Sequence, residues 1–276
     1  MWTFVELALV FLFVPETYPP LLVKKKANKL RQTGESRYWA PLERQVSSMA
    51  RKILISCYRP FQLLFFDQMA LLLDIWSALV LGILYLSFQA FPFIFGRVHH
   101  FNTQSTGLSF LGIGIGMLLG ISTQPIWNRL YKRTAAKNNG KVAPEVRLVM
   151  GEVGAICVPA GLFWLAFTTY PGVPWIVPII ASVPFGAGIY FVFTSTFTYL
   201  VTAYRPIAAS AMASNSAMRS TFAAVFPLFA RVMYVRLGTV GATALLAGLT
   251  ALLAPCPFIF RRIGARLRHK SRFAQQ

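Results

Sequence analysis

Acidic residues are scarce in this chain, and charge of either sign is low. Its 276 residues include 8 Asp or Glu against 27 Lys or Arg, and charged residues make up 13% of the total. Soluble domains average about 25% charged and about 45–50% apolar residues, whereas this chain is 56% hydrophobic. The composition excludes an ordinary soluble domain and indicates an integral membrane protein.

Cysteine and histidine are also scarce. Cys57, Cys157 and Cys256 lie far apart and outside any Cys-x-x-Cys pattern, so neither a disulfide framework nor a zinc site is predicted. His99 and His100 stand together without a neighbouring acidic residue. No nucleophile is paired with a base along the chain. We therefore expect no metal, no cofactor and no enzymatic activity.

Long apolar runs dominate the rest of the sequence. Most are about 20 residues or longer, which is enough for a helix to cross about 30 Å of hydrocarbon. The predicted fold class is an all-α membrane protein with six transmembrane helices and a short N-terminal helical stub. The six predicted spans are residues 61–88, 105–125, 149–169, 175–200, 207–234 and 240–260.

The basic residues alternate between the two ends of these spans. Residues 15–59 hold ten Lys or Arg, residues 126–148 and 261–276 hold six each, and Arg205 adds one, against three in the loops of the other side. Cytoplasmic loops are enriched in Lys and Arg, so these segments and the C-terminus are predicted to be cytoplasmic. Because no basic face lies on a folded soluble domain, nucleic-acid binding is not expected. The expected partner is the lipid bilayer.

The N-terminal segment does not fit a signal peptide. It is apolar but too short to span, contains Glu6, and lacks a basic start and a small-residue cleavage site. We interpret it as the end of an incomplete transmembrane helix. The predicted organisation is an incomplete helix at 1–14, a basic cytoplasmic linker at 15–59, a six-helix bundle at 60–260 and a basic cytoplasmic tail at 261–276.

Two carboxylates fall inside the first predicted span. Asp67 and Asp74 are seven residues apart and lie near one helix face. At 1.5 Å per residue, Asp74 is about 20 Å in from the start of the span, near the midplane. A carboxylate there is costly unless it is protonated, paired or hydrated. Asp74 is therefore predicted to couple transport to protons or to bind a substrate cation, with a structural ion pair as the alternative.

Other polar residues mark a second helix and a loop. Asn215 and Arg219 are four residues apart, so they share a face of the fifth predicted span. A buried guanidinium pairs with a carboxylate or binds an anionic group, and we expect a structural or gating role, with Asp67, Asp74 or a group outside this chain as its partner.

Glu145, Arg147 and Glu152 surround the start of the third predicted span. There are two interpretations. These residues either form salt bridges from the loop to the helices that hold a gate, or they are solvated charges at the interface.

Several short segments follow one another in a characteristic order. They are Pro15-Glu16-Thr17-Tyr18, Gly107-Leu108-Ser109-Phe110-Leu111-Gly112, Pro144-Glu145-Val146-Arg147-Leu148, Gly161-Leu162-Phe163-Trp164, and Ser210-Ala211-Met212-Ala213 with Asn215 and Arg219. On these segments the chain resembles the C-terminal half of a fungal major facilitator superfamily transporter, of the twelve-span drug:proton antiporter type. The resemblance covers nearly the whole chain. It departs from the family at Thr202, where the family usually has an acidic residue, and at Asp67-Gln68, where the family often has Glu-Pro.

The resemblance implies a secondary transporter that exports drug-like or polyamine-like organic compounds against protons by alternating access between two bundles. It also implies the plasma membrane. The partners would be a small organic substrate, the proton, and either the missing N-terminal half or a dimer mate. The polar residues expected to form the substrate and proton pathway are Asp67, Asp74, Gln89, Asn215 and Arg219. Those expected to serve gating or structure are Glu145, Arg147 and Glu152.

A second interpretation stays open at this point. The chain then represents a truncated product or an incomplete gene model without transport activity of its own, or a membrane subunit that acts through partners. In this superfamily the substrate site lies between two halves, and the resemblance covers only one of them.

Overall fold

A computed structural model of the chain describes residues 2–33, 37–41, 43, 49–138, 142–271 and 273–274. Its regular elements are all helical over these residues. The chain forms two compact units, residues 1–56 and residues 57–276.

The first unit contains α1 (Trp2–Phe13), α2 (Pro19–Gln32) and the start of α3 (Met49–Phe66). The 12-residue α1 is apolar and none of its residues is buried. Two prolines open α2, where their missing N–H groups cost nothing because the first turn has no intrahelical acceptors for them.

An ion pair folds the following segment back onto α2. The Arg31 guanidinium donates to both carboxylate oxygens of Glu43, at 2.7 and 3.0 Å, and also to Asn28. It lies 4.7 Å from the ring centre of Trp39. The hydrogen bond from Arg31 holds the pKa of the Glu43 carboxyl below its usual range, and the same bond raises the pKa of Arg31.

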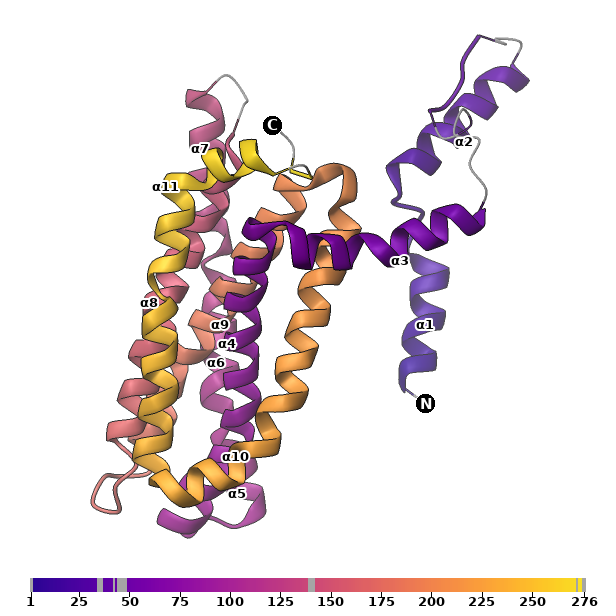
Figure 1. Cartoon of the computed structure of the whole chain (residues 1–276). Helices are drawn as coiled ribbons and strands as arrows, with labels where there is room; N and C mark the ends of the chain where they lie inside the picture. The colour runs from indigo at the N-terminus through magenta and orange to yellow at the C-terminus, as the bar shows by residue number, and fades with distance from the viewer. Residues whose placement is uncertain are drawn as a thin grey trace. The chain divides into compact units, whose positions relative to one another are not determined.

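The second unit is a bundle of long helices that begins with the last turns of α3 (Figure 1). Its remaining elements are α4 (Gln68–Phe91), the π-helix η1 (Pro92–Val98), α5 (Thr103–Ser109), α6 (Leu111–Ser122), α7 (Gln124–Lys137), the 3-10 turn η2 (Pro144–Arg147), α8 (Leu148–Phe167), α9 (Ile176–Ala203), the 3-10 turn η3 (Arg205–Ile207), α10 (Ala208–Leu253) and α11 (Pro255–Lys270).

Five continuous helical stretches among the described residues are long and apolar enough to cross a membrane. The last of them, Arg205–His269, is 65 residues long. It folds back on itself at Gly238, which adopts φ 70° and ψ 173°, a conformation almost restricted to glycine. Counting its two limbs separately, the described bundle makes six passes, and the predicted all-α membrane fold is confirmed. The five stretches are Gln68–Val98, Thr103–Lys137, Pro144–Phe167, Ile176–Ala203 and Arg205–His269.

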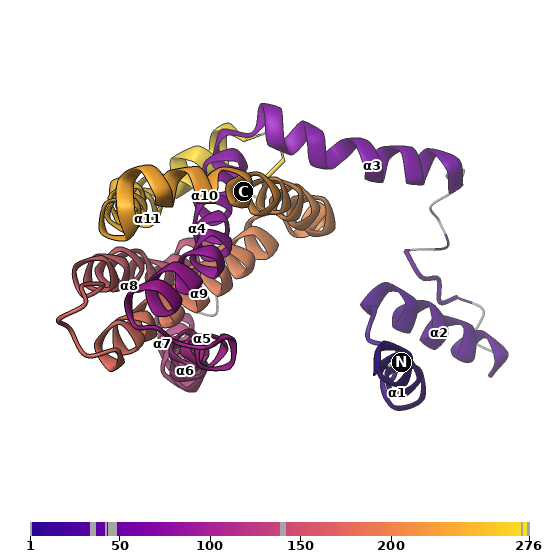
Figure 2. The same ribbon diagram turned by 90° about the horizontal axis from the view of Figure 1, so that it is seen from below.

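The centre of the bundle is α9, which packs extensively on both α8 and α6, while α4 packs on α10 (Figure 2). Glycine allows α6 and α9 to touch backbone to backbone. A Cβ added to Gly116 of α6 would clash with the carbonyl of Val183 and lie 2.9 Å from the amide nitrogen of Ala187. A Cβ added to Gly186 of α9 would clash in the same way with the carbonyl of Ile113. Such close approach through small residues is a usual means of joining helices in membranes.

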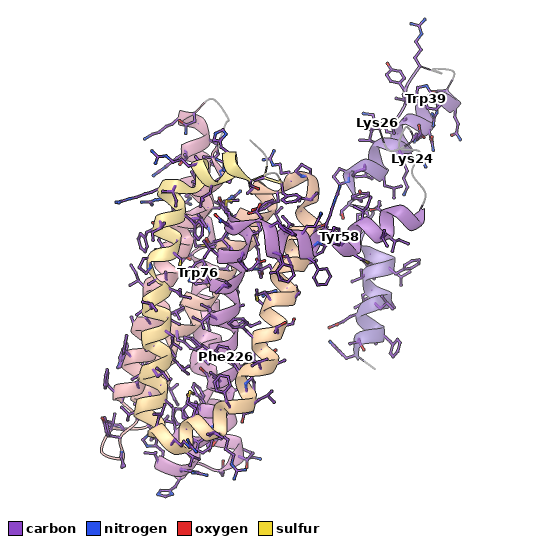
Figure 3. The ribbon with its side chains drawn as sticks, in the orientation of Figure 1. Lys24, Lys26, Trp39, Tyr58, Trp76 and Phe226 are labelled. Carbon is purple, nitrogen blue, oxygen red and sulfur yellow. The ribbon has the colours of Figure 1, made fainter. Side chains whose placement is uncertain are left out.

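Aromatic side chains fill the contacts of α4 with its neighbours. Trp76 is 2% exposed, and its ring reaches Gly151 of α8. The ring of Phe226 from α10 lies over Gly82 of α4, where an added Cβ would be 2.9 Å away (Figure 3). These contacts join α4 to α8 and to α10, and the buried core also includes many residues of α9.

The first span begins at Gln68 and not at residue 61 as the sequence predicts. Asp67 has an extended backbone and interrupts the helix between α3 and α4. Its side chain accepts hydrogen bonds from the amide groups of Met69 and Ala70, at 3.0 and 3.1 Å. These are the contacts of a helix N-cap. Hydropathy alone misses this break because apolar residues lie on both sides of the pair Asp67-Gln68.

Candidate functional site

A closed polar cluster lies between α4 and α10. Asp74 is completely buried, and its two carboxylate oxygens accept hydrogen bonds from Ser214 Oγ at 2.7 Å and Asn215 Nδ2 at 2.8 Å. The same Asn215 Nδ2 donates to Ser77 Oγ at 2.8 Å. All four side chains are at most 1% exposed. The structure thus brings together two predicted site residues, Asp74 and Asn215, on different helices.

One atom of this cluster has no partner. The side-chain oxygen Asn215 Oδ1 is buried and accepts no hydrogen bond. Buried polar atoms of this kind are costly, and proteins usually satisfy them. Because Asp74 accepts from two neutral groups that remain donors at any pH, the cluster can hold the Asp74 carboxylate without a cation beside it.

Arg219 lies one helical turn beyond Asn215 on α10. Its guanidinium is 4.6 Å from the ring centre of Phe197 and 5.4 Å from that of Phe193, both on α9. Its Nε atom is buried without a hydrogen-bond partner. Cation–π contacts of this kind stabilise a guanidinium that has left water.

Arg219 forms no direct salt bridge with Asp67 or Asp74, although Asp74 is near enough to interact with it electrostatically, so the predicted pairing stays a prediction. Neither carboxylate lies within ion-pair distance of Arg219 in the described part of the chain. The reason is that neutral donors already surround both carboxylates. A partner for Arg219 outside this chain stays a prediction.

Asp67 lies at the end of the bundle and contacts three separate segments. Besides capping α4, it accepts a hydrogen bond from Tyr204 OH at 2.8 Å and another from Ser271 Oγ in the C-terminal segment. It borders a cavity of about 660 Å³ that is also lined by Tyr58, Leu267 and Phe273. These contacts account for Asp67 as a structural junction, and its part in a substrate pathway stays a prediction.

Two ion pairs join α8 and its preceding turn to α11. The carboxylate of Glu145 accepts hydrogen bonds from Arg268 Nε at 2.8 Å and from Arg268 Nη2 at 3.1 Å, so the pair is bidentate. Glu152 accepts from Arg261 NH1 at 2.8 Å. Both glutamates are nearly buried, at 8% and 9% side-chain exposure. Gly264 permits the approach, because a Cβ there would be 2.9 Å from Glu145.

The remaining predicted residues lie elsewhere. The Arg147 guanidinium is 3.7 Å from the ring centre of Tyr131, and its carbonyl accepts from Ser195 Oγ at 3.0 Å. Gln89 is exposed near the end of α4, away from the Asp74 cluster. Thr202, at the position where the resembling family has an acid, donates to the carbonyl of Thr198 in its own helix at 2.6 Å.

Sequence analysis missed several members of these clusters. Ser77 lies three residues after Asp74, so a search for hydroxyls on the same helix face would have found it. Ser214 directly precedes Asn215 and carries no such signal, because adjacent residues of a helix do not share a face. Tyr204 and Ser271 carry no such signal, because only the folded chain brings them to Asp67.

The fold and the cluster define a membrane-spanning helical bundle with a buried polar centre. Comparison with protein families identifies its class: residues 2–227 match the Major Facilitator Superfamily, and the chain belongs to that family. The family consists of transporters, which agrees with the resemblance drawn from the sequence.

The individual relatives that the chain resembles are fungal proteins named as efflux pumps or drug transporters. The chain is 49% identical to the efflux pump atB of Aspergillus terreus, over 99% of this chain and 59% of the pump. It is 42% identical to the probable drug/proton antiporter YHK8 of Saccharomyces cerevisiae, over 99% of this chain and 55% of that protein. The multidrug transporter mdrA of Aspergillus fumigatus is 40% identical, over 95% and 44%.

The chain therefore spans about half the length of these relatives, which agrees with a resemblance to one half of a transporter. No solved structure matches it.

Proposed function

We propose that this chain forms one bundle of a secondary transporter that exports small organic compounds in exchange for protons. The family and the names of the relatives, which include efflux pumps and a probable drug/proton antiporter, support this activity. Transport would proceed by alternating access, in which two bundles rock about a site near the midplane of the membrane. In this proposal the chain acts as a transporter and not as an enzyme.

The observation that carries the proposal is the burial of Asp74 between α4 and α10. Ionisable groups inside membrane helices are costly and usually belong to ion or proton pathways. Ser214 and Asn215 hold the carboxylate from the neighbouring helix, so a change in its protonation would alter the contact between the two helices. Asp74 is therefore the proposed proton carrier. Arg219, which shares a face of α10 with Asn215, is the proposed fixed positive charge near it.

The orientation and location belong to the same proposal. The basic residues of the α2–α3 region, the α7–η2 loop and the C-terminal segment favour the cytoplasm for that end of the bundle. In that orientation the Glu145–Arg268 and Glu152–Arg261 pairs would strengthen the cytoplasmic end of the bundle. The plasma membrane is proposed from the family resemblance.

The test is a substitution that removes only the titratable proton. Asp74→Asn keeps the shape of the side chain and one of its two accepting oxygens, and its new NH2 group can donate to Ser214 Oγ, which can also accept. We expect proton-driven export to fall to background in the full-length transporter. Asp67→Asn is the matched comparison, since it changes the carboxylate that caps the same helix. Export that persists in Asp67→Asn and is lost in Asp74→Asn would assign the proton to Asp74. Undiminished proton-driven export by Asp74→Asn would rule out Asp74 as the carrier.

A second candidate function follows from the length of the chain. Because it covers 59% of the efflux pump atB, the chain would need a complementary bundle to build a complete substrate site. Export should be measured for the chain alone and for the chain co-expressed with the first bundle of that pump. Activity only on co-expression would establish a half-transporter, whereas activity of the chain alone would indicate a dimer of this bundle.

A further inference from the structure

Helix α3 carries a stripe of large apolar side chains that the described residues leave more than half exposed. Leu54, Tyr58, Phe61 and Phe65 are spaced by four, three and four residues, so they lie on one face of the helix. Each is between 57% and 71% exposed. Tyr58 of this stripe is labelled in Figure 3. Leu63, on the opposite side of the same helix, is fully buried.

This stripe does not belong to a membrane span. The apolar part of α3, Ile53–Phe66, has 14 residues, which gives a length of about 21 Å against about 30 Å of hydrocarbon. Asp67 ends the helix and caps α4 one residue later. The last turns of α3 then lie across the start of α4 (Figure 1). An apolar helix that is too short to cross, and turned away from the crossing helix, is typical of an interfacial segment.

The charge of α3 indicates what it faces. The helix contains Arg51, Lys52 and Arg59 and no acidic residue. Arg59 is exposed and lies off the apolar stripe. Amphipathic helices with basic and aromatic residues bind at the surface of membranes that contain anionic lipids. Tyrosine is enriched at that boundary because its ring is apolar and its hydroxyl is wet.

We propose that α3 lies in the plane of the bilayer surface, with Leu54, Tyr58, Phe61 and Phe65 inserted among the acyl chains and Arg59 at anionic headgroups. Continuity with α4 argues for lipid as the occupant. The stripe ends three residues before the span that begins at Gln68, which places it at the depth where water gives way to hydrocarbon. The proposal concerns a surface outside the transport pathway and does not depend on proton coupling.

Site-directed spin labelling of the full chain tests this. In a background with all three cysteines replaced by serine, one cysteine at a time is introduced at the four stripe positions, and at Ser56 on the other side of α3, whose labelled samples are the matched controls. Each labelled protein is reconstituted into phosphatidylcholine vesicles with and without phosphatidylserine. Collision rates with oxygen, which concentrates in hydrocarbon, and with a water-soluble nickel chelate then report the depth of each label.

We expect the four stripe labels to collide with oxygen, at a depth of about 5–10 Å below the headgroups, and the controls to collide with nickel. Phosphatidylserine should deepen the stripe labels. Nickel access at the stripe equal to that of the controls would place the helix in water and overturn the proposal. Stripe labels that are immobile and shielded from both reagents would show a protein contact and overturn it as well. Unchanged depth on adding phosphatidylserine would overturn its electrostatic part.

Discussion

The backbone contact between α6 and α9 makes Gly116 a sharp test of the packing argument. Gly116→Ala places a methyl group against the carbonyl of Val183 and 2.9 Å from the amide nitrogen of Ala187. Backbone atoms cannot rotate away as a side chain can, so the two helices must separate. Overpacking of this kind costs about 1–3 kcal/mol.

A control on the same helix isolates that cost. Gly114 is two residues away on α6 and has no neighbouring atom within 4 Å of an added Cβ. Alanine there gains up to about 1 kcal/mol of helix propensity, a gain that shrinks when the unfolded reference state is also helical. We therefore expect Gly114→Ala to be neutral or slightly stabilising and Gly116→Ala to lower the free energy of unfolding by about 1–2 kcal/mol.

The assay is reversible unfolding in mixed micelles of a mild detergent and sodium dodecyl sulfate, followed by tryptophan fluorescence. Gly116→Ala and Gly186→Ala should be less than additive when combined, because the first substitution already separates the helices that the second would push apart. Equal stability of the Gly114→Ala and Gly116→Ala proteins would refute the close contact between α6 and α9.

Three further perturbations test the charged junctions. Glu145→Ala removes the bidentate partner of Arg268 and should cost about 1.5–3 kcal/mol in the same unfolding assay; a change within error contradicts the pairing. Asp67→Ala should cost about 0.5–2 kcal/mol as a lost helix cap, and Asp67→Asn should recover most of it, whereas equal losses would argue against capping. Because Arg31 lowers the pKa of Glu43 in the folded state, their pair contributes stability above the usual titration range of glutamate and loses it as the pH falls through the lowered pKa. Arg31→Gln should move the NMR titration midpoint of Glu43 upward, and an unmoved midpoint would contradict the pair.

Hydropathy was sufficient to predict the helical bundle and most of its boundaries. In lipid, a membrane segment must satisfy its own backbone hydrogen bonds as a helix, and the length of that helix can be read from the length of the apolar run. It failed at Asp67. There the apolar run continues from α3 into α4, and only the cap formed with Met69 and Ala70 shows that the helix stops. A continuous apolar pattern carries no information about a change of direction.

The candidate site was predicted only in part. Helical spacing relates residues of one helix, so it placed Asn215 and Arg219 on one face of α10. It could not relate α4 to α10, and therefore the contacts of Asp74 with Ser214 and Asn215 required the folded bundle. The sequence predicted that burying the guanidinium of Arg219 is costly. It could not predict that two aromatic rings on α9 stabilise this guanidinium, because those contacts depend on packing between helices.

The two ion pairs between α8 and α11 constrain the length of the chain between them. Glu145 and Glu152 are seven residues apart, and so are their partners Arg268 and Arg261, in the antiparallel sense. Deleting one residue between the two arginines would rotate one arginine by about 100° around the helix relative to the other. Only one of the two ion pairs could then form. Point substitutions in residues 262–267 that preserve the helix should be tolerated far better than insertions or deletions there, except at Gly264, where a side chain would meet Glu145.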